Sequence, residues 1–314
     1  MWLPPREPWY AHGVRHVLCA WCLLVAACDL GTDAVPPDAS PGADAYRGPN
    51  ADLVPPVGSD ATLDVASWNL EWFPKDERTV WLVVDLIASL ELDIVVVQEI
   101  ANVDAWNQLL ELLPQHDGVL STHQYSATEY QKIGVIYRRD LVVAGEPALL
   151  FSGQTYAFPR PALALPLTAG ALTFDLVGVH LKAGGSEDDS ARRAAAMRAL
   201  EAHVRAQVDA GGEDEVIVLG DFNETVDTSW GMEVMAPMLA APERYRFRSQ
   251  EAAEAGEASY IPSGRVIDHV VTTAGLADEV GGARAVIPRL DQQMARYEPY
   301  VSDHLPVVLS IPMP

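Results

Sequence analysis

Asp93 to Glu99 reads Asp-Ile-Val-Val-Val-Gln-Glu, an apolar run that ends in an amide and a carboxylate. Val216 to Asn223 reads Val-Ile-Val-Leu-Gly-Asp-Phe-Asn and is built in the same way. An uninterrupted run of β-branched and aliphatic residues is typical of a strand that is covered on both faces. The polar residues that end these runs therefore predict side chains held where buried strands meet loops, a common place for a functional site.

Short strands and helical segments alternate on either side of these two runs. Apolar spacing predicts helices over residues 77–90 and 103–113, and an Ala- and Arg-rich segment predicts a long helix over 189–208. Further strands are predicted over residues 63–69, 133–137, 163–167, 172–181, 266–272 and 305–311. This order predicts one mixed α/β domain, in which strands outnumber helices.

Polar residues recur at the ends of the other predicted strands. Taken one at a time, an Asp or Asn at such a position usually forms a turn or caps a helix. Their recurrence at six strand ends instead indicates a site. The residues are Asn69, Glu99, His180, Asp221 with Asn223, Asp268, and Asp303 with His304.

The motifs around these residues resemble, in order, those of the endonuclease/exonuclease/phosphatase superfamily. The resemblance implies a four-layered α/β sandwich, in which two β-sheets pack face to face with helices outside. It also implies hydrolysis of a phosphodiester, with the deoxyribonuclease and secreted-nuclease branch as the nearest in motif. The matching segments are Ser67-Trp68-Asn69, Val97-Gln98-Glu99, Gly178-Val179-His180-Leu181-Lys182, Leu219-Gly220-Asp221-Phe222-Asn223, Ile267-Asp268 and Ser302-Asp303-His304-Leu305-Pro306.

Four acidic residues of these motifs, Glu99, Asp221, Asp268 and Asp303, would repel an anionic substrate if they met in one cleft. A divalent cation resolves this conflict, because it neutralises carboxylates and acts as a Lewis acid on a phosphoryl oxygen. Oxygen ligands without cysteine favour Mg²⁺, or else Mn²⁺ or Ca²⁺. The resemblance makes Glu99 the principal ligand, with Asn69 beside it and Asp303 in support.

The resemblance assigns the catalytic roles to five residues. Asp268 would orient His304, because a carboxylate behind an imidazole fixes its tautomer and raises its basicity. Asp221 and Asn223 would position the attacking water and the phosphate, and His180 would contact the phosphate. The resemblance leaves open whether Asp221 or the Asp268–His304 pair is the general base.

Three further residues are candidates for substrate contact. Arg160, which is flanked by prolines, resembles the phosphate-contacting arginine of the deoxyribonuclease branch. Tyr137 and Lys182 are similar cases. For all three, a surface position without a role in binding is the alternative.

The N-terminal segment predicts export. Arg6 and Arg15 precede an apolar run over residues 17–27 that is too short to span a bilayer comfortably, which predicts a signal peptide over residues 1–27. An uncleaved anchor or a misassigned start codon is the alternative. The run ends in Val-Ala-Ala-Cys, which resembles a lipobox and implies cleavage before Cys28 and lipidation of its sulfur. We therefore expect a lipoprotein anchored to a membrane, periplasmic or at the cell surface.

Residues 28–62 are expected to tether the lipid anchor to a catalytic domain over residues 63–314. Six prolines, six acidic residues and one base occur between positions 29 and 62, with hardly any apolar periodicity. Such a segment buries too little surface to offset the entropy of ordering it. The sequence therefore predicts a disordered tether and a monomeric domain beyond it.

Composition limits the kinds of site and the classes of function that the protein can have. All three cysteines lie at or before position 28, which excludes disulfides and cysteine-ligated zinc from the domain. The net charge of −23 allows a basic nucleic-acid-binding face only locally. The leading hypothesis is an exported nuclease acting on DNA or RNA. A sphingomyelinase-like or other lipid or sugar phosphoesterase is the second, and a non-catalytic surface binding protein is the third.

Overall fold

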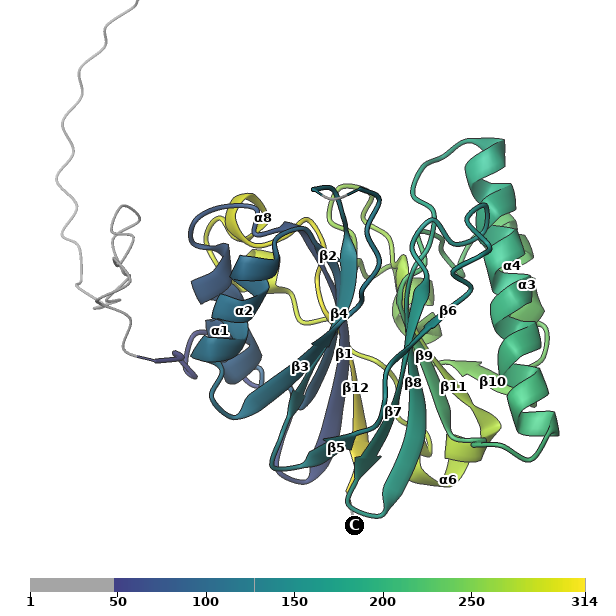
Figure 1. The fold of residues 1–314 in the computed structure, drawn as a ribbon, viewed down its shortest axis with the longest axis horizontal. Helices are drawn as coiled ribbons and strands as arrows, with labels where there is room; N and C mark the ends of the chain where they lie inside the picture. Colours follow the sequence, from purple (N-terminus) through teal and green to yellow (C-terminus); the bar gives the residue numbers. More distant parts are fainter. Residues whose placement is uncertain (1–47, 127, 314) are drawn as a thin grey trace, which may run out of the picture. The chain divides into compact units, whose positions relative to one another are not determined.

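The computed structural model describes residues 48–126 and 128–313 (Figure 1). The predicted signal peptide, Cys28 and the first part of the predicted tether lie outside the described residues. Within those two ranges, no helix is long and apolar enough to cross a membrane.

Two mixed β-sheets form the centre of the domain. The first has five strands in the order β12 (Val307–Pro312), β1 (Thr62–Phe73), β2 (Ile94–Ile100), β4 (Lys132–Arg138) and β3 (His116–Leu120). The second has seven, in the order β10 (Tyr245–Phe247), β11 (Asp268–Thr273), β9 (Val216–Asp221), β8 (Leu172–His180), β7 (Ala162–Ala169) and β5 (Val142–Ala144), with β6 (Ala148–Leu150) also paired to β7.

Helices cover the outer face of each sheet (Figure 1). The pair α1 (Thr79–Ser89) and α2 (Val103–Leu112) lies on the first sheet, and the pair α3 (Glu187–Asp209) and α4 (Ser229–Leu239) lies on the second. Short helices fill the connections near the C-terminal half: α5 (Gln250–Glu254), η2 (Ala274–Leu276), α6 (Ala277–Val280), α7 (Leu290–Gln293) and α8 (Tyr297–Tyr300). The predicted four-layered α/β sandwich is confirmed.

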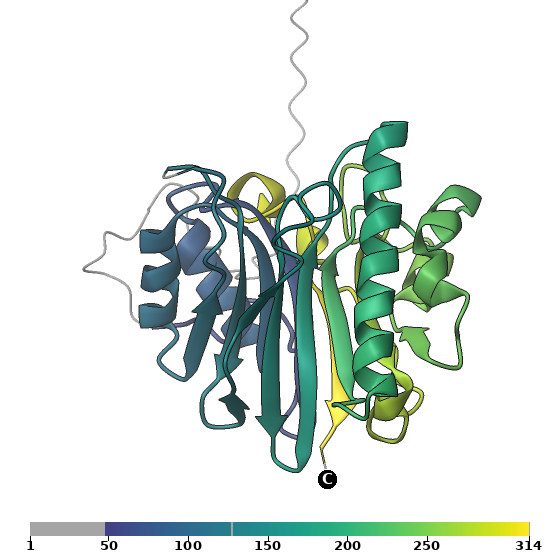
Figure 2. The same ribbon diagram turned by 45° about the vertical axis from the view of Figure 1, so that its right-hand side comes forward.

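The local sequence determines where the long helix α3 begins and which of its faces is buried. Ser186 accepts a hydrogen bond from the backbone of Asp189 at 3.1 Å, and Asp189 accepts one from the backbone of Ser186 at 3.2 Å, which forms a capping box. Arg193, Met197 and Val204 belong to its buried stripe. The helix runs along the outer face of the second sheet (Figure 2).

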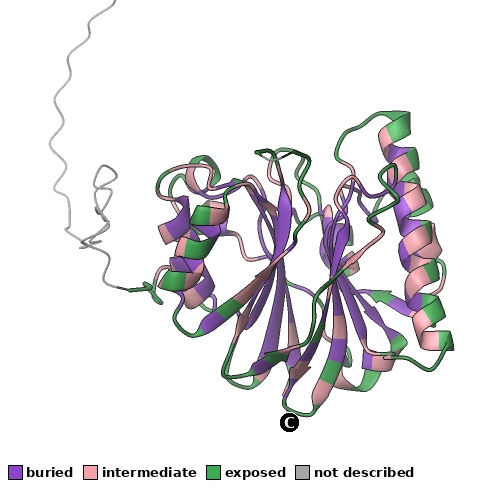
Figure 3. Cartoon of the chain, in the orientation of Figure 1, coloured by how far each residue is buried: buried purple, intermediate pink, exposed green. Residues whose placement is uncertain are grey.

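The two sheets meet in an apolar core. The strands are buried along most of their length, whereas the helices keep an exposed outer side (Figure 3). Gly178 of β8 shows how closely the sheets approach, because a Cβ atom there would lie 2.8 Å from Val96 of β2 and 3.2 Å from Ile133 of β4. A larger residue at position 178 would push the sheets apart.

The described part of the predicted tether is packed against the domain. The backbone amide of Asn50 donates to Asp85 at 2.7 Å, and that of Gly58 donates to Leu90 O at 2.9 Å. Val54 is only 5% exposed. The expectation of a disordered tether up to residue 62 is therefore wrong for residues 50–62, because a few apolar residues among the prolines suffice to anchor the segment on α1.

Candidate active site

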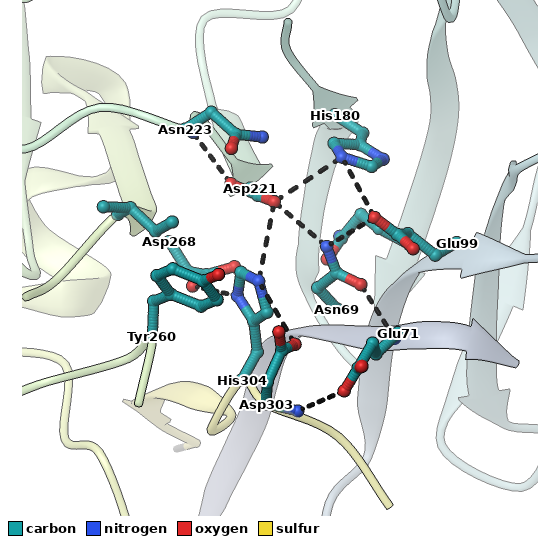
Figure 4. Close-up of polar contacts among 12 residues, drawn as sticks. Asn69, Glu71, Glu99, His180, Asp221, Asn223, Tyr260, Asp268, Asp303 and His304 are labelled. Carbon is teal, nitrogen blue, oxygen red and sulfur yellow. Dashed lines mark hydrogen bonds and ion pairs between the residues drawn. The ribbon is translucent and has the colours of Figure 1, made fainter. Parts of the chain in front are cut away.

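The strand-end residues singled out in the sequence converge at one end of the two sheets (Figure 4). Strand register explains the meeting in the second sheet, where Asp221 of β9 lies opposite His180 of β8 and Asp268 of β11. The first sheet contributes Asn69 from β1 and Glu99 from β2. Strands therefore hold Glu99, His180, Asp221 and Asp268, whereas Asp303 and His304 lie in the segment before β12.

Asp221 occupies the centre of this cluster. Asn69 joins the two sheets, because its side-chain amide donates to Asp221 Oδ2 at 3.0 Å and to Glu99 Oε1 at 3.4 Å. The backbone amide of Asn223 donates to Asp221 Oδ1 at 2.8 Å. His180 Nε2 lies 3.5 Å from Asp221 Oδ2 and 3.7 Å from Glu99 Oε1. Three of the predicted residues, Asn69, His180 and Asn223, thus surround one carboxylate.

His304 and Asp268 form a hydrogen-bonded pair beside this centre. His304 Nδ1 lies 2.9 Å from Asp268 Oδ2, and Ser259 Oγ donates to the same oxygen at 2.7 Å. This contact leaves His304 Nε2 directed at the cluster, 4.0 Å from Asp221 Oδ2 and 3.8 Å from Asp303 Oδ1. The predicted carboxylate–imidazole pair is present, with one ring nitrogen free to meet a substrate.

Burial and charge shift the pKa values of these groups in opposite directions. Burial, together with repulsion from Asp268, raises the pKa of Asp221 to about 7. Burial disfavours the charged form of His304, but Asp268, Asp221 and Asp303 outweigh it and raise the pKa of His304 to about 10. Burial and the charge of Arg160 hold the pKa of His180 well below its usual value. At neutral pH, His304 is therefore a cation and His180 is neutral.

Several site residues adopt left-handed backbone conformations. Glu71, Trp72, Glu99 and Asn223 have φ values of 44°, 56°, 62° and 52°. Such conformations cost about 1–3 kcal/mol each for residues other than glycine and persist only where the surroundings enforce them. Hydrogen bonds within the site do so, since Trp72 N donates to Glu99 Oε2 at 3.1 Å and Glu71 N donates to Asn69 Oδ1 at 3.0 Å. The strained backbone thus lies in the site, where the side chains must be held in a fixed orientation.

The donor set fits a hard divalent cation. One ligand atom each of Asp221, Asp268 and His304 lies within 4.8 Å of the others. Because His304 Nδ1 is already bound to Asp268, we consider these three better suited to proton transfer than to ligation. Among the described residues, Asp268 Oδ1 and both ring nitrogens of His180 are buried without a hydrogen-bond partner. Buried polar atoms without hydrogen-bond partners, next to several carboxylates, fit a site that binds a charged ligand.

The predicted metal ligands are only partly brought together. Asn69 and Glu99 contact each other, whereas Asp303 approaches the cluster at His304, with Asp303 Oδ1 3.8 Å from His304 Nε2. The backbone amide of Asp303 donates to Glu71 Oε2 at 2.8 Å. Burial raises the pKa of the Asp303 carboxyl to about 6. Glu71 therefore joins the acidic side of the site.

Of the three predicted substrate contacts, only Arg160 borders the cluster. Its Nε and Nη2 donate to Gln131 Oε1 at 3.2 and 2.7 Å, and its Nη1 donates to Leu181 O at 3.2 Å. Lys182 instead forms an ion pair with Asp189 at the start of α3, at 2.8 Å. Its ammonium group is thus engaged by the helix cap and not by the site.

The prediction for Tyr137 is wrong. Strand β4 runs antiparallel to β2, so Tyr137 lies opposite Ile94 at the far end of the sheet. The end of β4 that reaches the site carries Lys132, which lies opposite Ile100. Lys132 Nζ donates to Ser121 O at 3.0 Å and therefore supports a loop.

Sequence reasoning missed several residues that shape the site. Ser259 supports Asp268, and the ring of Tyr260 lies 4.7 Å from that of His304. Both belong to the segment before β11 and have no local signal. Glu71 could have been found, because it is a carboxylate two residues beyond Asn69 at the end of the same strand.

Fold and site together define the class of α/β-sandwich proteins that carry a carboxylate–histidine site at their strand ends. The sequence matches the profile of the Endonuclease/Exonuclease/phosphatase family over residues 66–304, and the chain belongs to that family. A search of curated proteins finds no match.

Solved structures share the fold at low sequence identity. Caenorhabditis elegans TDP2, in truncated form, is similar with a TM-score of 0.59 and 14% identity over 80% of this chain and 98% of that one. The catalytic domain of human Nocturnin with bound sulfate is similar with a TM-score of 0.59 and 17% identity, over 80% of this chain and 93% of that one. The Neisseria 3′ phosphatase NExo bound to a product DNA hairpin is similar with a TM-score of 0.59 and 16% identity, over 80% of this chain and 100% of that one.

Proposed function

We propose that this protein is an exported nuclease that hydrolyses phosphodiester bonds of DNA or RNA with a divalent cation. The observation that carries the proposal is the Asp268–His304 pair, whose free Nε2 lies 4.0 Å from the buried carboxylate of Asp221. Membership of the family supports hydrolysis of a phosphoester. Solved relatives that hold a single-stranded DNA product or a DNA hairpin support nucleic acid as the substrate.

The residues of this chain divide the chemistry between them. Protonated His304 donates its Nε2 proton to the leaving oxygen as the bond between that oxygen and phosphorus breaks. Asp221, with a pKa of about 7, accepts a proton from the attacking water, and Asn223 aligns that water. Neutral His180 and the Arg160 guanidinium face the phosphate from the second sheet.

A divalent cation would be held by Glu99, with Asn69 beside it and Asp303 in support. When bound, it supplies charge neutralisation and Lewis-acid activation of the phosphoryl group. Its carboxylate ligands and the lack of cysteine in the domain favour Mg²⁺ or Mn²⁺.

A substrate panel tests the proposal. The full-length protein, purified in detergent, is incubated with Mg²⁺ or Mn²⁺ and with DNA, RNA, sphingomyelin or a chromogenic phosphodiester. We expect turnover of nucleic acid and complete loss of turnover with EDTA, because the acidic cluster then has no counter-charge. Turnover that survives thorough chelation would rule out the metal-dependent mechanism, and turnover of sphingomyelin alone would point to a lipid phosphodiesterase.

Export and lipid anchoring are a separate part of the proposal and rest on the sequence. Cys28 ends a lipobox-like run and is the sole thiol of the expected mature chain. The Cys28→Ser variant should therefore leave the membrane fraction, which fractionation and mass spectrometry of the N-terminus can measure. A wild-type protein with a different mature N-terminus and no lipid would contradict this prediction.

A further inference from the structure

Trp72 is a large apolar side chain that is exposed beside the candidate active site. It is 56% exposed, although Leu70 and Phe73 on either side of the Glu71–Trp72 pair are fully buried. Its backbone amide donates to Glu99 Oε2 at 3.1 Å. The position of its backbone is thus fixed by a residue of the site, while its side chain faces solvent.

The backbone at this point is strained where β1 shifts its register against β2, between Asn69 and Phe73. Glu71 and Trp72 are consecutive residues with φ values of 44° and 56°. Two successive left-handed conformations are uncommon outside glycine, because the Cβ atom approaches the following carbonyl oxygen. The turn carries Phe73 into the core and leaves Trp72 outside. Strain kept next to a site is a reason to look for function there.

The indole is available to a ligand. Among the described residues, no stacked ring or cation–π partner involves Trp72, whereas Tyr260 and Tyr300 each have one. An exposed indole at the rim of a phosphoesterase site offers a flat surface on which a base can stack, whatever its identity.

The surroundings favour a nucleobase over a membrane. Insertion into lipid needs a contiguous apolar patch, but Trp72 is preceded by Glu71, which forms an ion pair with Lys75. A protein with a net charge of −23 also has few cations with which to grip a phosphate backbone, so stacking can supply affinity that charge does not.

We propose that Trp72 is a stacking platform for an unpaired nucleobase next to the scissile phosphate, so that the site prefers single-stranded nucleic acid. Bases within a duplex are already stacked on both faces and cannot reach the indole without unpairing. The inference rests on the proposed phosphodiesterase function and names the form of its substrate.

The test compares Trp72→Ala, Trp72→Phe and Trp230→Ala in the full-length protein. Trp230 is a matched control, because it is 52% exposed and lies in α4. The substrates are oligothymidylate, an oligomer of the same length made of abasic residues, and an oligothymidylate–oligoadenylate duplex. KM and kcat are measured for each, and circular dichroism and thermal unfolding confirm that the variants fold.

We expect Trp72→Ala to raise KM for oligothymidylate by about 10- to 100-fold, the usual effect of removing one stacked aromatic side chain. Trp72→Phe should restore most of the affinity, and Trp230→Ala should behave as the wild type. The abasic oligomer should not distinguish the variants, and the wild type should prefer oligothymidylate to the duplex.

Several outcomes would overturn the inference. An equal loss on the abasic oligomer would mean that Trp72 only positions Glu99, and no loss on either would mean that it is not a platform. Loss of binding to sphingomyelin vesicles, without loss on oligothymidylate, would assign the indole to a membrane. If the wild type cleaves no phosphodiester, the proposed function fails, and fluorescence anisotropy of the same oligomers still decides whether Trp72 binds bases.

Discussion

Replacing His304 by alanine or Asp268 by asparagine is expected to lower kcat by about 10²–10⁴-fold, the usual contribution of a positioned acid–base group. The reason is geometric. Asp268 Oδ2 holds His304 Nδ1 at 2.9 Å, and this contact directs Nε2 at the cluster. Since each variant disables the same unit, the double variant should be little slower than either single one.

A graded control tests the pairing. Ser259→Ala removes the hydrogen bond to Asp268 Oδ2 at 2.7 Å but leaves the carboxylate in place, so its effect on kcat should be smaller than that of Asp268→Asn. Single-turnover rates of the four variants, with thermal unfolding of each, make the measurement. Losses in kcat that add in full in the double variant would show that Asp268 and His304 act independently.

The sequence predicts the strand-end residues well because the signal there is local. Glu99 and Asp221 each follow an apolar run, and the chain reverses or turns directly after it. His180 follows the same rule, whereas Asp268 begins β11 and Asn69 lies before the end of β1. Neighbouring strands at the centre of a sheet have their ends close together. The polar residues at these strand ends are therefore already good candidates for site residues.

The supporting contacts are not local, and the sequence could not indicate them. The segment that carries Ser259 and Tyr260 pairs with the segment before β12, through Leu305 N to Ser259 O at 2.7 Å and a bridge between Tyr260 and His304. This contact joins the segment before β11 of the second sheet to the segment before β12 of the first sheet. The prediction for Tyr137 was wrong for a related reason, because the direction of β4 relative to β2 is a property of the sheet and not of the strand.

The expected effect of Glu99→Gln is loss of activity without loss of the fold. Glutamine keeps an oxygen that can accept the hydrogen bond from Trp72 N, which lies 3.1 Å from Glu99 Oε2. It removes the negative charge that the proposed cation needs. We expect turnover at moderate Mg²⁺ to fall by about 10²–10³-fold, which corresponds to the several kcal/mol that a metal ion supplies to charge stabilisation.

Metal titration separates this effect from a general defect. The Mg²⁺ or Mn²⁺ concentration for half-maximal activity should rise about tenfold or more in Glu99→Gln, and raising the metal should recover part of the rate. The increase in melting temperature that metal gives the wild type should shrink, because a weaker ligand stabilises the fold less. In EDTA, the two proteins should melt at similar temperatures.

Glu91→Gln is the matched control for this titration. Glu91 is exposed and has a φ of 58°, close to the 62° of Glu99, but it follows α1 and lies outside the cluster. Its replacement makes the same chemical change in the same backbone conformation, so it should alter neither the metal requirement nor the rate. If Glu99→Gln keeps the wild-type metal dependence, or if Glu91→Gln shifts it equally, Glu99 is not the principal ligand.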